Sequence, residues 1–262
     1  MQPDPIIDER LRVVTYNLHS CVDRRRGLCH AKTLQAVRGL NPDVAAFQEV
    51  DVGIPRTGGI DQIRYLAENL GMQFVFCPAV PHGPGRYGIG VLSRFPLETV
   101  RCELLPMLRP FRFERRCALH VRVRTAAGRV SLINTHLGLF APERRIQAAA
   151  LTGERWLGAV APNEPVVMCG DLNAGPRSPV YRRLAALLQD VQRADDFRQS
   201  ARPTFSSRRP RFRLDHIFVS DHFRILGVSV PQAQLFREIS DHLPLCTDLA
   251  LDRSAPNRER SR

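Results

Sequence analysis

The chain has 262 residues, of which 44% are hydrophobic, and both values fit one large globular domain. The composition excludes collagen-like, coiled-coil and long disordered chains. The formal net charge is +12, and Lys32 is the only lysine, so arginine carries nearly all of the positive charge. This charge favours anionic partners such as nucleic acid, a phosphoinositide or a phospholipid surface. It does not choose among them, because an arginine bias can also reflect codon usage.

The chain carries no targeting or membrane signal that the sequence reveals. Near its start there is no apolar run of the kind a signal peptide needs, and no uncharged apolar stretch is long enough to cross a bilayer. The seven cysteines are dispersed and form no C-x-x-C pair. Several stand inside apolar runs, as Cys169 does, so we expect reduced thiols in the core. These features together predict a cytoplasmic protein without a transmembrane segment.

Apolar runs with strand or helix periodicity follow one another along the chain. The predicted strands are residues 11–16, 44–47, 74–77, 88–93, 99–105, 117–124, 130–135, 166–169, 212–219, 225–230 and 243–249. The predicted helices are residues 31–40, 60–70, 142–160 and 178–188. Gly71 is the expected C-cap of the second helix, and Ser178 is the expected N-cap of the fourth.

This order of elements predicts an α/β architecture of two packed β-sheets with helices outside. We expect one domain over residues 11–251, preceded by an N-terminal extension of residues 1–10. The polar tail, residues 252–262, is expected to fray.

Polar side chains suited to catalysis stand at the borders of six predicted strands. They are Asn17, Gln48 with Glu49, Asn134 with His136, Asp171 with Asn173, Asp215 with His216, and Asp241 with His242. Strand ends on one side of a sheet converge in space, and α/β enzymes place their sites there. We therefore expect these residues to form a single site.

The residue types in this set suit metal-assisted hydrolysis of a phosphoester. Glu49, Asp241 and Asn17 offer hard oxygen ligands of the kind that Mg²⁺ or Mn²⁺ prefers. His136 and His242 can donate hydrogen bonds to phosphate oxygens. Hydrolysis also needs a base or orienting group for water and help for the leaving oxygen, and the set contains groups for both tasks.

Each motif taken alone also has a structural explanation. Asp171 and Asn173 are typical of a turn held by side-chain to backbone hydrogen bonds. Glu49 after a buried strand can be a surface residue, and a single histidine is more often structural than catalytic. The coincidence of six such motifs at strand borders is what favours a functional site.

In chain order, the motifs Thr-Tyr-Asn17, Phe-Gln-Glu49, Asn-Thr-His136, Gly-Asp171-Leu-Asn173, Arg-Leu-Asp215-His and Ser-Asp241-His242 resemble those of the endonuclease/exonuclease/phosphatase superfamily. The resemblance spans residues 11–251. It implies a four-layer α/β sandwich, with two mixed sheets face to face and helices outside. It also implies a Mg²⁺-dependent phosphodiesterase that uses in-line attack of water, with Mn²⁺ as the alternative cofactor.

The resemblance further implies a role for each residue. Glu49 is expected to be the principal metal ligand, with Asn17 and Asp241 nearby. Asp171 is expected to orient or deprotonate the attacking water, assisted by Asn173.

The same resemblance assigns the two histidines to the phosphate. His242 is expected to contact the scissile phosphate and to be braced by Asp215. His136 is expected to assist at the phosphate or at the leaving oxygen. An alternative remains open for Asp171 and Asn173, which are also suited to bind a second metal ion.

Substrate contacts are predicted from basic and aromatic residues beside the catalytic strands. Arg211, Phe212 and Arg213 are candidates to grip flanking phosphates and to stack on a base or sugar. An amphipathic edge strand explains the same alternation of arginine with apolar residues. Tyr87 is a further, weaker candidate.

The preferred prediction is a monomeric, nuclease-like enzyme acting on a phosphate-containing polyanion. Val50 and Asp51 stand where abasic-site endonucleases usually carry Thr-Lys, which counts against that branch. A phospholipid or inositol-phosphate phosphoesterase is the alternative. A third reading, a catalytically silent phosphate-binding module, is disfavoured because all eight catalytic and metal-site residues are present.

Overall fold

The computed structural model describes residues 10–251, with the exception of residues 24, 109–113, 195 and 197–200. The strands are β1 (Leu11–Asn17), β2 (Val44–Val52), β3 (Gln73–His82), β4 (Gly85–Ser93), β5 (Leu97–Leu104), β6 (Cys117–Thr125), β7 (Gly128–His136), β8 (Val166–Asp171), β9 (Gln189–Asp190), β10 (Asp215–Val219), β11 (Phe223–Ser229) and β12 (Leu245–Leu251). The helices are α1 (His30–Leu40), α2 (Gln62–Leu70), α3 (Ala141–Thr152), α4 (Pro179–Ala185) and α5 (Gln234–Ile239). Short 3₁₀ turns include η1 (His19–Cys21), η2 (Pro55–Thr57) and η3 (Leu157–Ala159).

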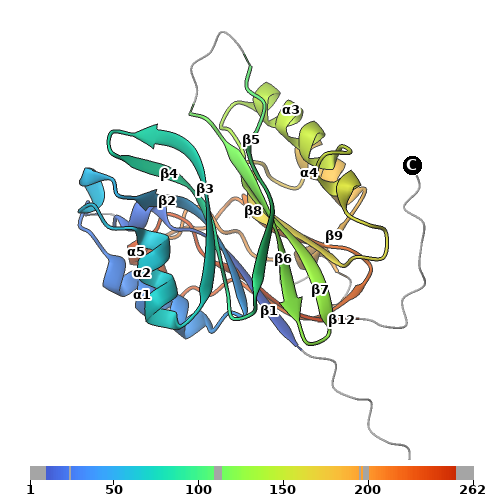
Figure 1. The fold of residues 1–262 in the computed structure, drawn as a ribbon, viewed down its shortest axis with the longest axis horizontal. Helices are drawn as coiled ribbons and strands as arrows, with labels where there is room; N and C mark the ends of the chain where they lie inside the picture. The colour runs from blue at the N-terminus through green and yellow to red at the C-terminus, as the bar shows by residue number, and fades with distance from the viewer. Residues whose placement is uncertain (1–9, 24, 109–113, 195, 197–200, 252–262) are drawn as a thin grey trace, which may run out of the picture.

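These strands form two mixed sheets of six strands each (Figure 1). One sheet has the order β11-β12-β1-β2-β4-β3, and the other has the order β5-β6-β7-β8-β10-β9. In the middle of each sheet two strands run parallel, β1 with β2 and β7 with β8. Parallel neighbours end at the same edge of a sheet, so the sheets place the ends of four strands where a site can form.

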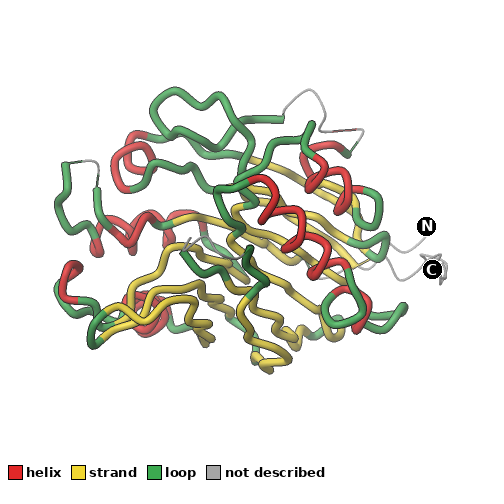
Figure 2. The backbone as a smooth tube through the Cα atoms, turned by 90° about the horizontal axis from the view of Figure 1, so that it is seen from above, coloured by secondary structure: helices red, strands yellow, loops and turns green. Residues whose placement is uncertain are grey.

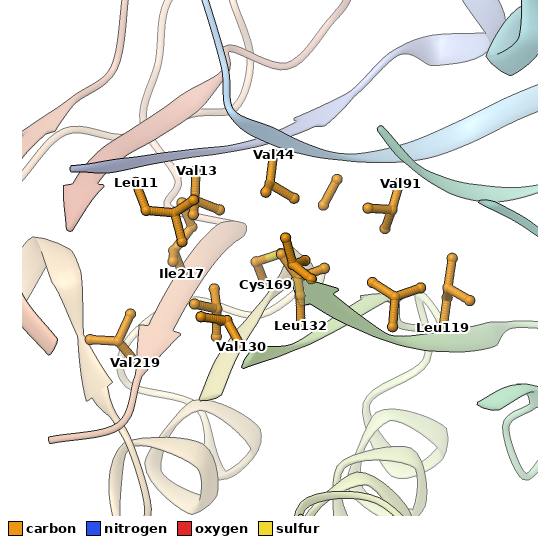
Figure 3. Close-up of a cluster of buried hydrophobic side chains, with 14 of the residues drawn as sticks. Leu11, Val13, Val44, Val91, Leu119, Val130, Leu132, Cys169, Ile217 and Val219 are labelled. Atoms are coloured by element: carbon orange, nitrogen blue, oxygen red, sulfur yellow. The ribbon is translucent and has the colours of Figure 1, made fainter. Parts of the chain in front are cut away.

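The main core lies between the two sheets (Figure 3). Val13 and Val44 of the first sheet belong to the same buried cluster as Leu132 of the second. Successive side chains of a strand point to opposite faces, so the neighbouring Val14 belongs to a different cluster, under the helices. Because both faces of the central strands are buried, their sequences are continuous apolar runs rather than alternating apolar and polar residues.

Helices cover the outer face of each sheet (Figure 1; Figure 2). Leu34 of α1 and Leu66 of α2 are buried in one cluster with outward-facing residues of the first sheet. Leu151 of α3 and Leu184 of α4 are buried in another cluster, with Met168 of the second sheet. The order helix, sheet, sheet, helix confirms the predicted four-layer α/β sandwich.

Most predicted elements are present, but several predicted boundaries are wrong. The strand predicted over residues 44–47 continues to Val52, so Glu49 lies within β2 rather than after it. The helix predicted over residues 142–160 ends at Thr152, because Gly153 adopts an extended conformation. The apolar residues after it form the turn η3 and still pack against the second sheet through Trp156 and Leu157. The strand predicted over residues 212–219 begins only at Asp215, because Phe212 pairs with Phe205 in the preceding loop. The sequence analysis did not predict α5.

The cysteines correct a second expectation. Cys77 on β3 and Cys102 on β5 form a disulfide, which joins an edge strand of each sheet. The expectation of reduced thiols is therefore wrong for this pair, and the pair gives no support to a reducing compartment. The remaining cysteines are free and buried, and they are Cys21, Cys29, Cys117, Cys169 and Cys246.

The predicted N-terminal extension, apart from Arg10, and the predicted C-terminal tail lie outside the described residues. In the described ranges, none of the helices has both the length and the apolar character needed to cross a bilayer.

Candidate active site

The strand pairing brings the predicted residues of each sheet together. In the first sheet Asn17 at the end of β1 is level with Gln48 of β2, immediately before Glu49. In the second sheet Asp171 at the end of β8 is level with His136 on one side and with Asp215 on the other. Two strand ends from the first sheet therefore meet three from the second.

Irregular backbone at two strand ends gives the acidic side chains their position. Glu49 lies in a β-bulge between Phe47 and Val50 and has a φ of +56°, which is uncommon for a residue other than glycine. Gly170, directly before Asp171, has a φ of +138°. A Cβ atom at Gly170 would lie 1.9 Å from the carbonyl oxygen of Thr135, so only glycine fits there.

Asn17 links the two sheets at the centre of the site. Its fully buried amide Nδ2 donates to Oε1 of Glu49 at 2.9 Å and to Oδ2 of Asp171 at 3.1 Å. The amide oxygen Oδ1 accepts the backbone N–H of His19 at 3.0 Å. Asn17 therefore orients two carboxylates, and its predicted role as a metal ligand stays a prediction.

Asp171 is the buried centre of the site. Its Oδ1 accepts the backbone N–H of Asn173 at 2.8 Å, and its Oδ2 lies 3.5 Å from Nε2 of His136 and 3.6 Å from Nε2 of His242. Burial is the largest influence on this carboxyl, and it raises the pKa of Asp171 to about 7 against the opposing charge of His242.

His242 forms a dyad with Asp215. Nδ1 of His242 donates to Oδ2 of Asp215 at 2.8 Å, and Asp215 is completely buried. Burial lowers the pKa of His242, but the charges of Asp215 and Asp171 outweigh it and raise that pKa to about 10. The imidazole is thus held in its charged form, with Nε2 toward Asp171.

His136 is held from its other side by an arginine. Nη1 of Arg116 lies 3.2 Å from Nδ1 of His136 and donates to Glu114. Burial, followed by the charges of Arg116 and His242, keeps the pKa of His136 well below its ordinary value. His136 is therefore neutral. Arg116 can only donate, which places the His136 proton on Nε2, but Nδ2 of Asn173, which is also a donor, lies 3.2 Å from Nε2. Donation from Nε2 to a ligand therefore requires the Asn173 amide nitrogen to move away from the ring.

A cavity of about 500 Å³ opens next to these groups. Its walls come from the segment between β1 and α1, the bulge of β2, the loop after β2, strand β4, the segment before β6 and the segment before β12. The lining residues are His19, Ser20, Val22, Asp23, Arg26, Glu49, Arg56, Tyr87, Glu114 and Asp241. Glu49 and Asp241 thus face a space large enough for a small molecule.

The donor set on this wall fits a hard divalent cation. Burial raises the pKa of Glu49, and the charge of Asp241 adds to that rise although the Asn17 hydrogen bond opposes it. Two carboxylates that repel each other at the wall of a cavity are stabilised by a cation such as Mg²⁺. A second group, Asp171 with Asp215 and His242, has ligand atoms within 4.8 Å of one another. In this second group, His242 and Asp215 are hydrogen-bonded to each other.

The predicted substrate contacts are divided between the cavity and the surface. Tyr87 lines the cavity. Arg211 and Phe212 lie on the exposed loop before β10 and do not line it. Arg213 forms a largely buried ion pair with Asp190, so its guanidinium is committed to the fold. That use of Arg213 argues against the predicted contact with substrate.

The sequence analysis missed several residues that shape the cavity. His19 and Arg26 come from the irregular segment between β1 and α1, and Arg56 comes from the loop after β2. The signal for Arg56 was present in its loop, which follows β2 and contains the glycines Gly53, Gly58 and Gly59. Nothing in the pattern around His19 distinguishes it from a surface residue.

Comparisons with known proteins agree with this geometry. A model of the "Endonuclease/Exonuclease/phosphatase family" matches residues 14–242. An uncharacterized protein of Escherichia coli strain K12, YbhP, is 27% identical over 266 residues, which cover 95% of this chain and all of that protein. These matches extend over nearly the whole described fold.

Solved structures are similar over the same length. An endonuclease/exonuclease/phosphatase from Beutenbergia cavernae superposes with a TM-score of 0.74 and 25% identity, covering 92% of this chain and 72% of that one. The catalytic domain of human Nocturnin, solved with a bound sulfate anion, gives a TM-score of 0.70 and 22% identity, covering 93% and 94% of the two chains. This chain belongs to the endonuclease/exonuclease/phosphatase family of phosphoesterases.

Proposed function

We propose that the protein is a Mg²⁺-dependent, nuclease-like phosphodiesterase that hydrolyses its substrate by in-line attack of water. The observation that carries this proposal is the set of donors around one buried carboxylate. Asn17 lies 3.1 Å from Oδ2 of Asp171, and the histidines His136 and His242 lie 3.5 and 3.6 Å from the same oxygen. A carboxylate surrounded in this way suits a base that shares its surroundings with a phosphate group.

Asp171 is the proposed base. Its pKa of about 7 lets it take a proton from water near neutral pH and release it again after the reaction. The backbone N–H of Asn173 fixes Oδ1, while Oδ2 faces the two histidines. A water that gives its proton to Asp171 is therefore expected to lie on the side of the carboxylate where Oδ2 stands.

The histidines are the proposed donors to the phosphate. His242 is charged at neutral pH, is oriented by Asp215, and can donate from Nε2 to a phosphoryl oxygen. His136 is neutral and can donate from Nε2 to a phosphoryl or leaving oxygen. A charged and a neutral donor on the same phosphate stabilise the growing charge of the transition state.

Glu49 and Asp241 are the proposed holders of Mg²⁺, with Mn²⁺ as a substitute. When bound there, the cation supplies neutralisation of the charge that develops on the phosphate oxygens. Asn17 keeps Glu49 in place through its 2.9 Å hydrogen bond.

The net charge of +12 supports an anionic, phosphate-bearing substrate, and nucleic acid is the favoured member of that class. Plasmid DNA, RNA, phosphatidyl lipids and inositol phosphates are to be compared as substrates with Mg²⁺ present. Hydrolysis of lipid or inositol phosphate without hydrolysis of polynucleotide would reject the nuclease-like assignment and leave the phosphoesterase assignment intact.

The catalytic assignment is tested with Asp171→Asn and Glu49→Gln. Each is expected to lower kcat for bis-p-nitrophenyl phosphate by about 10²- to 10⁴-fold, as loss of a catalytic base or metal ligand does. Asp221→Asn, at a side chain that is 61% exposed, is the matched control and is expected to keep the wild-type rate. A rate within threefold of wild type in either active-site variant would contradict the assignment.

A further inference from the structure

The cavity beside Glu49 contains an arginine that no step of the proposed reaction uses. Nε and Nη2 of Arg56 donate to Oδ2 and Oδ1 of Asp51, each at 2.9 Å. Nη2 also reaches the hydroxyl of Ser20 at 3.3 Å. Asp51 itself is fully buried and accepts from Thr57 as well. The guanidinium is therefore fixed in one orientation by a buried carboxylate.

This side-on pairing leaves one edge of the guanidinium unused. A guanidinium has five N–H groups, and the bonds to Asp51 and Ser20 involve only Nε and Nη2. Nη1 has no hydrogen-bond partner within the described part of the chain. The Arg56 side chain is 47% exposed and lies on the cavity wall, with its Cζ atom 5.8 Å from the centre of the Tyr87 ring.

The other charged residues on the cavity wall bear on which ligands the free edge of Arg56 can bind. Two wall acids, apart from Glu49 and Asp241, already accept hydrogen bonds within the protein. Glu114 is bound by Arg116, and Asp23 accepts the backbone N–H groups of Arg25 and Gly27. Glu49 and Asp241 remain as the proposed holders of the cation, so the donors that the wall offers to an anion are the free edge of Arg56 and the guanidinium of Arg26.

The segment that carries His19 is rigidly held in an uncommon conformation. His19, Ser20 and Cys21 have φ values of +48°, +53° and +52°. Residues other than glycine seldom adopt this region, and such strain persists only where the surroundings impose it. Gln62 holds the Ser20 carbonyl at 2.6 Å, and Asp51 accepts the Ser20 hydroxyl. Asp51 thus accepts hydrogen bonds from both the turn and Arg56, and these bonds hold this part of the cavity wall in place.

We propose that Arg56 is a specificity-determining residue that binds a second phosphate group of the substrate, separate from the phosphate that is hydrolysed. This inference rests on the proposed function, since it takes the scissile phosphate to lie at Glu49 and His242. A preoriented guanidinium with a free edge binds phosphate oxygens through charge-assisted hydrogen bonds. The cavity of about 500 Å³ has room for a compact phosphorylated group.

Binding of non-hydrolysable phosphonates tests the proposal without any turnover. Propane-, butane- and hexane-diphosphonic acid are each compared with the monophosphonic acid of the same chain length, by calorimetry with Mg²⁺ present. Wild-type protein is expected to bind the diphosphonate of at least one length about tenfold more tightly, as a charge-assisted hydrogen bond provides. Equal affinity within every pair would overturn the proposal.

Substitutions of Arg56 test whether this residue causes the preference for two phosphonates. Arg56→Gln is expected to abolish the preference for two phosphonates and to bind monophosphonates as wild type does, which also shows that the variant is folded. Arg56→Lys is expected to keep part of the preference, because it keeps the charge and loses the fork geometry. Arg129→Gln, at an exposed position near the start of β7, is the control and is expected to match wild type. A preference that survives in Arg56→Gln would refute the role of this residue.

The source of the second phosphate is separated by another pair of probes. Short oligothymidylates with and without a 5′-phosphate are bound to the Asp171→Asn protein, in which hydrolysis is blocked, with and without Arg56→Gln. An Arg56-dependent gain only with the 5′-phosphate assigns the group to a nucleic-acid end, and a gain only with diphosphonates assigns it to a small molecule. No Arg56-dependent gain in either series would overturn the proposal. The binding readout is independent of hydrolysis, so failure of the proposed reaction remains distinguishable.

Discussion

The dyad of His242 and Asp215 gives the most demanding test of the electrostatics of the site. Asp215→Asn keeps the size of the side chain and removes its charge, while the 2.8 Å contact to Nδ1 remains possible. In the wild-type protein the pKa of His242 is about 10 against an ordinary 6.5. That difference corresponds to roughly 5 kcal/mol in favour of the charged imidazole. This net difference is not the contribution of Asp215 alone, because burial opposes it and the charge of Asp171 adds to it.

With the Asp215 charge removed, burial remains as the largest influence on His242 and lowers its pKa. The imidazole is then expected to lose its proton near or below neutral pH. It thereby loses the charged donor that faces the phosphate, and an amide in place of the carboxylate also permits the wrong tautomer. We expect kcat/KM to fall by about 10²- to 10⁴-fold at pH 7.5.

Two measurements follow this change. Titration of the His242 ring by NMR reports its pKa in both proteins, and hydrolysis of bis-p-nitrophenyl phosphate with Mg²⁺ reports kcat/KM. Asp221→Asn again serves as the control for loss of a surface carboxylate. An Asp215→Asn protein that keeps a charged His242 at pH 8 and a kcat/KM within threefold of wild type would refute the reasoning.

Three further predictions test the base, the core and the backbone. Because the ionised form of Asp171 is the active one and its pKa is about 7, kcat/KM is expected to rise with pH through that value; a flat profile between pH 5.5 and pH 8 contradicts its role as the base. Burial lowers the pKa of His120 to about 4 from an ordinary 6.5, so the unfolded chain binds an extra proton between these values. The free energy of unfolding is therefore expected to fall as the pH drops from 6.5 toward 4, by up to roughly 1.4 kcal/mol per pH unit. In urea unfolding, His120→Gln is expected to make this pH dependence weaker. Gly170→Ala places a Cβ atom 1.9 Å from the backbone oxygen of Thr135 and is expected to lower the free energy of unfolding by roughly 3 kcal/mol or more. At Gly39 a Cβ atom would meet nothing within 4 Å outside its own helix backbone, so Gly39→Ala is expected to be neutral or slightly stabilising. Equal melting temperatures for the two variants would refute the steric argument.

The central strands could be predicted because their apolar runs are buried on both faces and end in polar residues. Asn17, His136 and Asp171 stand at such ends, and the parallel pairing of β1 with β2 and of β7 with β8 brings them to common edges. Periodicity could not show where the helix after Pro142 ends, because the apolar spacing continues beyond Gly153 while the backbone does not.

Roles that depend on the orientation of a side chain were beyond the sequence. The amide of Asn17 turns its oxygen to the His19 backbone and its nitrogen to the carboxylates, an arrangement that the sequence does not reveal. The ion pair of Arg213 with Asp190 joins residues from a loop and a short edge strand, and nothing in the local pattern announces it. The disulfide between Cys77 and Cys102 likewise depends on which edge strands of the two sheets meet.

The central claim is that the residues around Asp171 hydrolyse a phosphodiester with the help of a divalent cation held at Glu49 and Asp241. The most direct measurement is the rate of bis-p-nitrophenyl phosphate hydrolysis by protein stripped with a chelator, as Mg²⁺ is added back. We predict a rate at background without the cation that rises to saturation with Mg²⁺ in wild type and stays at background in Glu49→Gln. A full rate in the stripped protein, or no hydrolysis at any Mg²⁺ concentration, would contradict the account.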